Sequence, residues 1–321
     1  MENPIRTKVY HCYDLIKSIT LSNGLTEIGN EAFFNCENLE SVVISDSVTK
    51  IGPYAFAQSG LKSIILPYQP YQSKGLTEIG EKAFRSCRNL ETVVIPNSVT
   101  KIGPFAFSCS GLKSITLLDG RLIKIGESAF CGCDNLETVV IPNSVTKIGS
   151  SAFAYSGLKS ITLPHGLTEI GKDIFRSCSK LETVVIPETV TKIDYGAFTW
   201  SGLKSITLPH GLTKIDNGAL YGCDNLETLV IPETVTKIGS DAFRCSGLKS
   251  IILPDGLIEI GENAFYNCKN LETITIPKTV TKIGRYAFEH SGLKSITLPY
   301  RVKIGKDAFR NCHNLVVSPF I

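Results

Sequence analysis

Apolar and polar residues alternate in short stretches along nearly the whole chain. The stretches come in pairs, such as LKSITLP and GLTEIG, with a proline- or glycine-containing turn between them. Their period of two and their β-branched residues predict short β-strands. The segment that follows each pair, for example GKDIFRSC, is too short for a regular helix. We expect a turn or a single coil of helix there.

The paired stretches belong to a sequence repeat. Aligned on the leucine or isoleucine that opens the first stretch, the chain contains thirteen units, most of them 22 or 23 residues long. The units begin at Ile16, Leu39, Leu61, Leu90, Leu112, Leu136, Leu158, Leu181, Leu203, Leu226, Leu248, Leu271 and Leu293, and Leu315 opens a stub. Two kinds of unit alternate, one beginning LKSITLP and the other LETVVIP, so the full period is about 45 residues.

A unit of this size cannot enclose a hydrophobic core by itself, so successive units must stack. Stacking in register produces parallel sheets and makes each repeat position a column of equivalent residues. This predicts a β-rich repeat solenoid over residues 16–314, with an N-terminal cap at 1–15 and a truncated last unit or C-terminal cap at 315–321. A solenoid end that is left uncovered tends to self-associate, so a homodimer through that end is one expectation.

One column of the predicted core is aromatic. It contains Phe33, Phe56, Phe84, Phe107, Phe130, Phe153, Phe175, Phe198, Phe243, Phe265, Phe288 and Phe309, with Leu220 as its interruption. Another column, in front of each leading leucine, holds mainly Gly and Asn, as at Gly60 and Asn89, with Lys180 as the exception. Because Gly and Asn tolerate positive φ, we expect left-handed corners there and at the glycine of each IG pair.

The full repeat reads L-x-x-I-x-[IL]-P-x-x-[VL]-x-x-I-G-x-x-A-F-x-x-[CS] across residues 16–314. It resembles the BspA-like leucine-rich repeat of bacterial and protist surface proteins. The resemblance implies a right-handed leucine-rich-repeat superhelix with one strand of each unit in a concave sheet. It also implies adhesion or binding of a host protein at a cell surface. The first residues lack the pattern of a secretory signal and no apolar run is long enough for a membrane span, so the sequence itself assigns no location.

The charges follow the repeat as well. The net charge is +3 over 63 charged residues, which is too balanced to indicate a nucleic-acid partner. The first outward column of the sheet alternates Lys17, Glu40, Lys62, Glu91, Lys113, Glu137, Lys159, Glu182, Lys204, Glu227, Lys249, Glu272 and Lys294. We interpret this alternation as pairing of neighbouring charges. In the second strand the alternation lapses at two lysine trios, Lys101, Lys124 and Lys147, then Lys192, Lys214 and Lys237. A solvated face is the simpler interpretation of the trios, and binding of an anionic polysaccharide is the alternative.

No residue pattern indicates catalysis. The serine and threonine column beside the charges has no histidine at the matching position, so a nucleophile–base pair is not expected. Seven of the eleven cysteines recur in every other unit and alternate with serine, which predicts buried, reduced core thiols. Cys109 and Cys131 fall in adjacent units, which leaves a disulfide between them open. The cysteine spacings do not match a zinc site, and we expect no metal, no cofactor and no enzyme activity.

Binding through an extended face is therefore the expected function, with a protein as the partner, and a structural spacer is the alternative. Comparison of the units shows that the residues around each spine phenylalanine vary most. Tyr, Trp and Arg, the types enriched at protein interfaces, gather there. The candidate binding residues are Tyr155, Tyr195, Trp200, Tyr221, Tyr266, Tyr286, Arg85, Arg176, Arg244 and Arg310. The second candidate surface is the outward column of the sheet at Thr116, Val140, Thr162, Val185, Thr207 and Val230.

Overall fold

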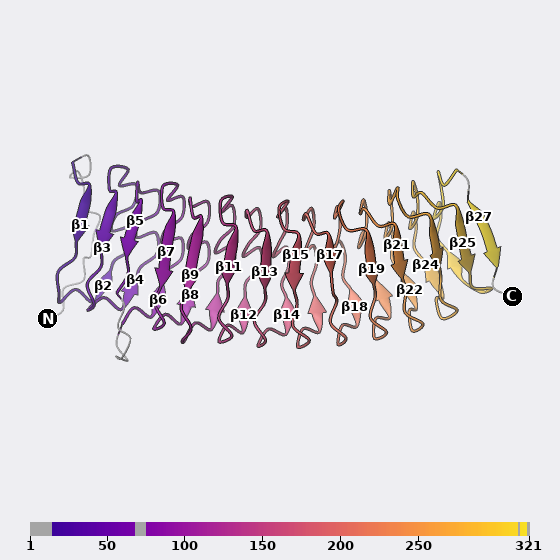
Figure 1. Cartoon of the computed structure of the whole chain (residues 1–321), viewed down its shortest axis with the longest axis horizontal. Helices are drawn as coiled ribbons and strands as arrows, with labels where there is room; N and C mark the ends of the chain where they lie inside the picture. Colours follow the sequence, from indigo (N-terminus) through magenta and orange to yellow (C-terminus); the bar gives the residue numbers. More distant parts are fainter. Residues whose placement is uncertain (1–14, 68–74, 314, 320–321) are drawn as a thin grey trace. The chain divides into compact units, whose positions relative to one another are not determined.

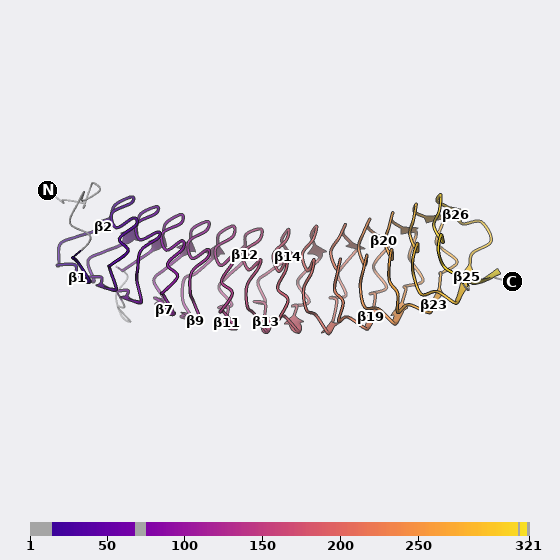
Figure 2. The same ribbon diagram turned by 90° about the horizontal axis from the view of Figure 1, so that it is seen from above.

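The computed structural model describes residues 15–67, 75–313 and 315–319. The chain divides into two compact parts, residues 1–166 and 167–321, and from here on "unit" means one of these parts and "coil" means one sequence repeat. Each unit is a parallel-strand β-solenoid, and the two together contain about thirteen coils, one for each sequence repeat (Figure 1). Within each unit the odd-numbered strands line one side and the even-numbered strands the other (Figure 2). The described residues contain no helix, so the third side of each coil, after its two strands, is built from turns.

In unit 1–166, the first strand of each coil is β1 (Ser18–Thr20), β3 (Ser41–Val43), β5 (Ser63–Ile65), β7 (Thr92–Ile95), β9 (Ser114–Leu117), β11 (Thr138–Val140) and β13 (Ser160–Thr162). The second strands are β2 (Glu27–Ile28), β4 (Lys50–Ile51), β6 (Glu78–Ile79), β8 (Lys101–Ile102), β10 (Lys124–Ile125) and β12 (Lys147–Ile148). The second strands form one continuous parallel sheet in chain order. Equivalent residues are in register, as Ile51 and Ile79 show.

In unit 167–321, the first strands are β15 (Thr183–Val185), β17 (Ser205–Ile206), β19 (Thr228–Val230), β21 (Ser250–Ile252), β23 (Thr273–Thr275), β25 (Ser295–Leu298) and β27 (Val316–Pro319). The second strands are β14 (Glu169–Ile170), β16 (Lys192–Ile193), β18 (Lys214–Ile215), β20 (Lys237–Ile238), β22 (Glu259–Ile260), β24 (Lys282–Ile283) and β26 (Lys303–Ile304). Pairing is again parallel and in register, which confirms the stacking that the repeat predicts.

The phenylalanine column is a stacked spine inside each unit. In unit 1–166 successive rings are 5.1–5.6 Å apart between centroids and their planes differ by at most 11°. In the other unit Phe243, Phe265, Phe288 and Phe309 repeat the arrangement at 5.1–5.4 Å. Leu220, where the spine is interrupted, is buried in the same column. Burial of this column and of the leading leucines is the main stabilising term of a fold whose single coils have no core of their own.

The turn side of each coil has left-handed residues, but not at the expected positions. Positive φ occurs two residues before and two residues after the spine phenylalanine, for example at Tyr54 and Gln58 around Phe56. The predicted left-handed residues, such as Gly60, Asn89 and the glycine of each IG pair, have ordinary φ. That prediction was wrong. The reason for glycine is close approach, because a Cβ on Gly60 would lie 1.9 Å from the carbonyl oxygen of Glu37 in the preceding coil.

This close approach explains why two kinds of unit alternate. After the spine phenylalanine, one kind of coil makes a longer corner of the type NCEN and the next a shorter corner of the type QSG. The longer corner folds over the glycine of the shorter one, whose amide donates a hydrogen bond of 3.0 Å to the carbonyl of the cysteine before it. The contact recurs six times, as Cys36–Gly60, Cys87–Gly111, Cys133–Gly157, Cys178–Gly202, Cys223–Gly247 and Cys268–Gly292. The structural unit is therefore a pair of coils.

The predicted N-terminal cap falls mostly outside the described residues. Its last residue, Leu15, is 91% exposed and does not cover the first coil. The inserted residues 68–74 also lie outside the described part of the chain.

Candidate binding surfaces

Five side chains on the turn side of unit 167–321 form a continuous ridge over successive coils. We call this set, Trp200, Tyr221, Arg244, Tyr266 and His290, the corner ridge. The rings of Trp200 and Tyr221 are 4.9 Å apart between centroids. The guanidinium of Arg244 lies 5.7 Å from the Tyr221 ring and 4.5 Å from the Tyr266 ring. The Tyr266 ring meets His290 edge-on at 5.6 Å, so the ridge is held by its own ring and cation–π contacts.

The charge within the corner ridge is already compensated. Arg244 Nη1 lies 3.1 Å from Asp241 Oδ1, a residue three positions earlier in the same coil. The ridge therefore presents flat rings with little net charge, which favours a neutral or apolar contact over an anionic one. His290 was not among the predicted residues, although it occupies the same position after the spine phenylalanine as Trp200 and this alignment identifies it.

The other predicted corner residues do not join the ridge. Two arginines of the same unit form ion pairs instead, Arg176 with Asp173 at 3.6 Å and Arg310 with Glu289 at 3.7 Å. The Tyr195 ring contacts the ammonium of Lys172, and the Tyr286 ring contacts the guanidinium of Arg285. Tyr155 and Arg85 belong to unit 1–166. Sequence position places these residues on the turn side of the coil but does not show which of them cluster, because clustering depends on which side chains are long enough to meet their neighbours.

The charge column of the first strands consists of ion pairs, as predicted. Each lysine after the first coil reaches the glutamate of the preceding coil with N–O distances of 2.6–3.0 Å, in the pairs Lys62–Glu40, Lys113–Glu91, Lys159–Glu137, Lys204–Glu182, Lys249–Glu227 and Lys294–Glu272. The hydrogen bond and the charge of Lys62 lower the pKa of Glu40 below its usual value. The pairs are well exposed, so solvent screens them and each contributes little to stability.

The lysine trios are less cationic than the sequence suggests. In the second trio, Lys192, Lys214 and Lys237 lie 2.9–3.0 Å from Asp194, Asp216 and Glu259 respectively. In the first trio Lys101 contacts Glu78 at 2.9 Å. Within the described part of the chain, only Lys124 and Lys147 of the six have no ion pair, and they are adjacent in the β10–β12 register. The sequence contains a signal for two of these pairs, because aspartate replaces the IG glycine two residues after Lys192 and Lys214, but the sequence prediction did not connect it with the lysines.

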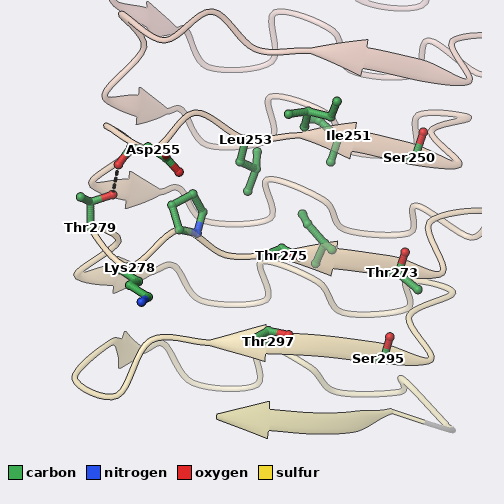
Figure 3. A pocket seen from close by; sticks show the side chains of 13 residues that line it. Ser250, Ile251, Leu253, Asp255, Thr273, Thr275, Lys278, Thr279, Ser295 and Thr297 are labelled. Carbon is green, nitrogen blue, oxygen red and sulfur yellow. Dashed lines mark hydrogen bonds between the residues drawn. The ribbon is translucent and has the colours of Figure 1, made fainter. Parts of the chain in front are cut away.

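The outward face of the first strands is hollowed in unit 167–321. A depression of about 740 Å³ lies over β21, β23 and β25 (Figure 3). A second depression, of about 370 Å³, lies over β17, β19 and β21 and shares Ser250 and Ile252 with the first. In Figure 3, Ser250, Thr273 and Ser295 form one column, with Thr275 and Thr297 further along the strands. The two depressions form one shallow surface along five strands, which we call the strand-face groove.

The centre of the strand-face groove is apolar and uncharged. Ile252 and Val230 are each 63% exposed there, a large fraction for aliphatic side chains. Hydroxyl groups border them, and the ion pairs Glu227–Lys249 and Glu272–Lys294 follow at the start of the strands. Val230 and Thr207 belong to the predicted outward column. Ile252, Thr275 and Thr297 continue that column, and the repeat register identifies them.

The periodic thiols, buried except for the half-buried Cys312, are held in a hydrogen-bond network. Cys87, Cys133, Cys223, Cys268 and Cys312 each donate to the carbonyl of a spine phenylalanine at 3.0–3.3 Å. Each also lies 3.3–3.4 Å from the hydroxyl of the serine in the preceding coil. Because the thiol hydrogen goes to the carbonyl, the serine hydroxyl is the donor to sulfur. Burial raises the pKa of Cys223 to about 12, so this thiol stays protonated and unreactive.

The described residues contain no group of three His, Cys, Asp or Glu side chains able to hold a metal ion. His210 uses both its amide and its ring to contact Glu188, at 3.0 and 3.2 Å. Nor do they include a helix with the length and hydropathy of a membrane span.

Comparison with known proteins relates these features to other chains. A family model described as "BspA type Leucine rich repeat region (6 copies)" matches residues 3–120, 77–204 and 191–316. Among solved structures, a leucine-rich repeat protein from Bacteroides ovatus ATCC 8483 is similar, with 27% identity, a TM-score of 0.76 and coverage of 95% of this chain and 92% of that one. The pneumococcal vaccine antigen PcpA is similar at 22% identity and a TM-score of 0.61, with coverage of 99% and 81%, which indicates a shared fold. The comparison with curated proteins found no match.

Proposed function

Because this chain belongs to the BspA-type leucine-rich repeat family, we propose that it is a non-enzymatic binding protein that recognises another protein through its strand-face groove. Proteins of this repeat class generally bind proteins or mediate adhesion. The observation that supports the groove as the contact surface is its pair of adjoining depressions, centred on exposed Val230 and Ile252. Exposed aliphatic side chains inside a concave surface mark contact sites more often than isolated ones do.

The chemistry of the groove indicates the kind of partner. Its centre is aliphatic and hydroxyl-lined, the charges at the start of the strands are paired with each other, and Asp255 and Lys278 line the opposite end. A partner that contributes an extended, mainly uncharged segment would bury Val230 and Ile252 without leaving unpaired charges. A highly anionic polymer would gain little, since four of the six lysines in the trios have acidic neighbours. We therefore do not extend the proposal to anionic polysaccharide.

The test is a pair of matched substitutions in the full chain. Ile252→Glu places a charge in the groove, and Ile65→Glu places one at the equivalent repeat position of unit 1–166, where exposure is 61%. Proteins retained by the wild-type chain from a cell-surface extract are identified, and their affinity for each purified variant is measured by biolayer interferometry. We expect Ile252→Glu to lose at least tenfold in affinity and Ile65→Glu to bind like the wild type.

A third variant separates the groove from the corner ridge. Trp200 has φ of +56°, and Asn tolerates this conformation, so Trp200→Asn removes the ring with little backbone cost. Loss of binding in Trp200→Asn with normal binding in Ile252→Glu would place the site on the corner ridge and overturn the proposal. If the wild-type chain retains no partner at all, the spacer function is favoured instead.

A further inference from the structure

Two free thiols meet at the turn side of consecutive coils in unit 1–166. Cys109 is exposed and Cys131 is half-buried, and no disulfide joins them. The amide of Cys109 donates a hydrogen bond of 2.8 Å to the carbonyl of Cys131. The path from one Cα to the other runs through the Cys109 amide nitrogen and the Cys131 carbonyl oxygen. Even if these three steps lay in a straight line, the two Cα atoms would be at most about 6.7 Å apart. That limit falls within the Cα separation of about 4.4–6.8 Å that a disulfide requires.

The side chains also have room to meet. The ideal Cβ position on Gly132, the residue after Cys131, lies 3.1 Å from the sulfur of Cys109, so this thiol points across to the next coil. Gly132 has φ of +69° and no side chain to block the approach. Burial raises the pKa of the Cys131 thiol, and the neighbouring Cys109 and Asp134 raise it further, which agrees with two sulfur atoms close together.

The equivalent residues in unit 167–321 show how two side chains at these positions are oriented. Trp200 and Tyr221 occupy the positions of Cys109 and Cys131 in the repeat, and the Trp200 amide donates the same hydrogen bond to the Tyr221 carbonyl, at 2.7 Å. Gly222 follows Tyr221 as Gly132 follows Cys131, and its ideal Cβ position lies 2.4 Å from the Trp200 ring. The two rings are in contact at 4.9 Å. Side chains at this pair of positions therefore lean toward each other across consecutive coils.

Solvent reaches the pair. Cys109 lines a depression of about 410 Å³ together with Arg88, Ser110, Gly132 and Asp134. The periodic core thiol closest in sequence, Cys133, has no exposed surface and is held by Ser110 and the Phe107 carbonyl. Among the cysteines that the structure describes, Cys109 is therefore the one that a small molecule in solution reaches first.

We propose that Cys109 and Cys131 form a reversible disulfide between consecutive coils when the protein meets a low-molecular-weight disulfide such as glutathione disulfide. The thiolate of Cys109 attacks one sulfur of the oxidant, which breaks its S–S bond, releases one glutathione and leaves a mixed disulfide on Cys109. The thiolate of Cys131 then attacks the Cys109 sulfur, forms the protein disulfide and releases the second glutathione. Two electrons and two protons pass from the protein thiols to the oxidant, and dithiothreitol reverses the exchange.

The test uses the purified full chain incubated with glutathione disulfide, quenched by acid and alkylation, and digested with trypsin. Cleavage at Lys101, Lys113, Lys124 and Lys147 puts the two cysteines on different peptides. We expect mass spectrometry to find IGPFAFSCSGLK linked to IGESAFCGCDNLETVVIPNSVTK, with fragment ions that place the link on Cys131 rather than Cys133. The link should disappear after reduction.

Cys245 provides a matched control within the chain. Cys245 occupies the same repeat position as Cys109, and its amide donates the equivalent hydrogen bond to the carbonyl of Tyr266. The residue at the partner position is therefore a tyrosine and not a cysteine. We expect Cys245 to stop at the mixed disulfide, and Cys131→Ser to make Cys109 stop there too. Serine already occupies the Cys131 position in another coil, at Ser108, so this variant should fold. A mixed disulfide on Cys109 that persists in the wild-type chain, or no reaction at either cysteine, would overturn the proposal.

Discussion

Replacement of Gly247 by alanine tests the idea that consecutive coils are locked in pairs. Gly247 lies under the longer corner of the preceding coil, and an added Cβ would sit 1.9 Å from the carbonyl oxygen of Asp224 and 2.7 Å from its carbon. Real Cβ contacts are not shorter than 3.0 Å, so the two backbones must separate by about 1 Å. That movement would break the 3.0 Å hydrogen bond from the Gly247 amide to the Cys223 carbonyl.

The expected cost follows from these two effects. Loss of a buried backbone hydrogen bond costs about 1–2 kcal/mol, and overpacking against backbone that cannot rotate away costs about 1–3 kcal/mol. We expect Gly247→Ala to lower the free energy of unfolding by about 3 kcal/mol. For a chain of 321 residues that unfolds cooperatively, this corresponds to a fall in Tm of about 5 °C. Circular dichroism during thermal and urea denaturation measures both quantities.

Gly256 provides the control in the same unit. Its ideal Cβ position has one neighbour, the carbonyl oxygen of Glu233 at 3.4 Å, which is ordinary contact, and its φ is not left-handed. Gly256→Ala should change the free energy of unfolding by less than about 0.5 kcal/mol, because the added methyl group fits and the unfolded chain loses freedom. Equal stability of Gly247→Ala and Gly256→Ala would refute the close-approach explanation of the repeat glycines.

Three further outcomes follow from the charges and thiols. Lys113→Ala removes the partner of Glu91 and should cost about 0.2–1 kcal/mol in urea denaturation, and this cost should disappear when the same change is made in a Glu91→Ala background. The hydrogen bonds from two lysines lower the pKa of Glu259, so its stabilising contribution is complete above the ordinary glutamate pKa and is lost as pH falls through the lowered value. The stability difference between wild type and Glu259→Gln should accordingly vanish in acid, and a difference that persists there contradicts the assignment. Iodoacetamide at pH 8 should alkylate Cys109 rapidly and Cys223 only after unfolding, since burial raises the pKa of the latter to about 12.

The repeat alone was sufficient to predict the parallel solenoid and its core. Each inward position is occupied by the same residue type in coil after coil, so the sequence alone predicts the phenylalanine spine and the Glu91–Lys113 type of ion pair. A residue type that recurs at one repeat position shows whether that position is buried or exposed in the typical coil. The coil count and strand positions were predictable for the same reason.

Three features were not predictable, because they depend on distances between neighbouring coils or on the shape of the backbone. The glycine at Gly60 looked like a left-handed corner, whereas it is required by a carbonyl of the preceding coil, a contact that composition cannot distinguish from a φ preference. Likewise, Trp200 and Tyr221 cluster while Tyr195 does not join them, and only the side-chain geometry separates these cases. The depressions over β17–β25 also arise from the shape of the backbone rather than from a residue pattern.

The alternation of long and short corners limits how such a chain can change in length. Removing one repeat would place two long corners, or two short ones, next to each other, and would bring glutamate beside glutamate on the adjacent strand. Removing two consecutive repeats keeps the alternation of corners and of charges at the junction. Gene duplications and deletions in this protein should therefore survive only in even numbers of repeats, and an engineer who lengthens the molecule should add about 45 residues at a time.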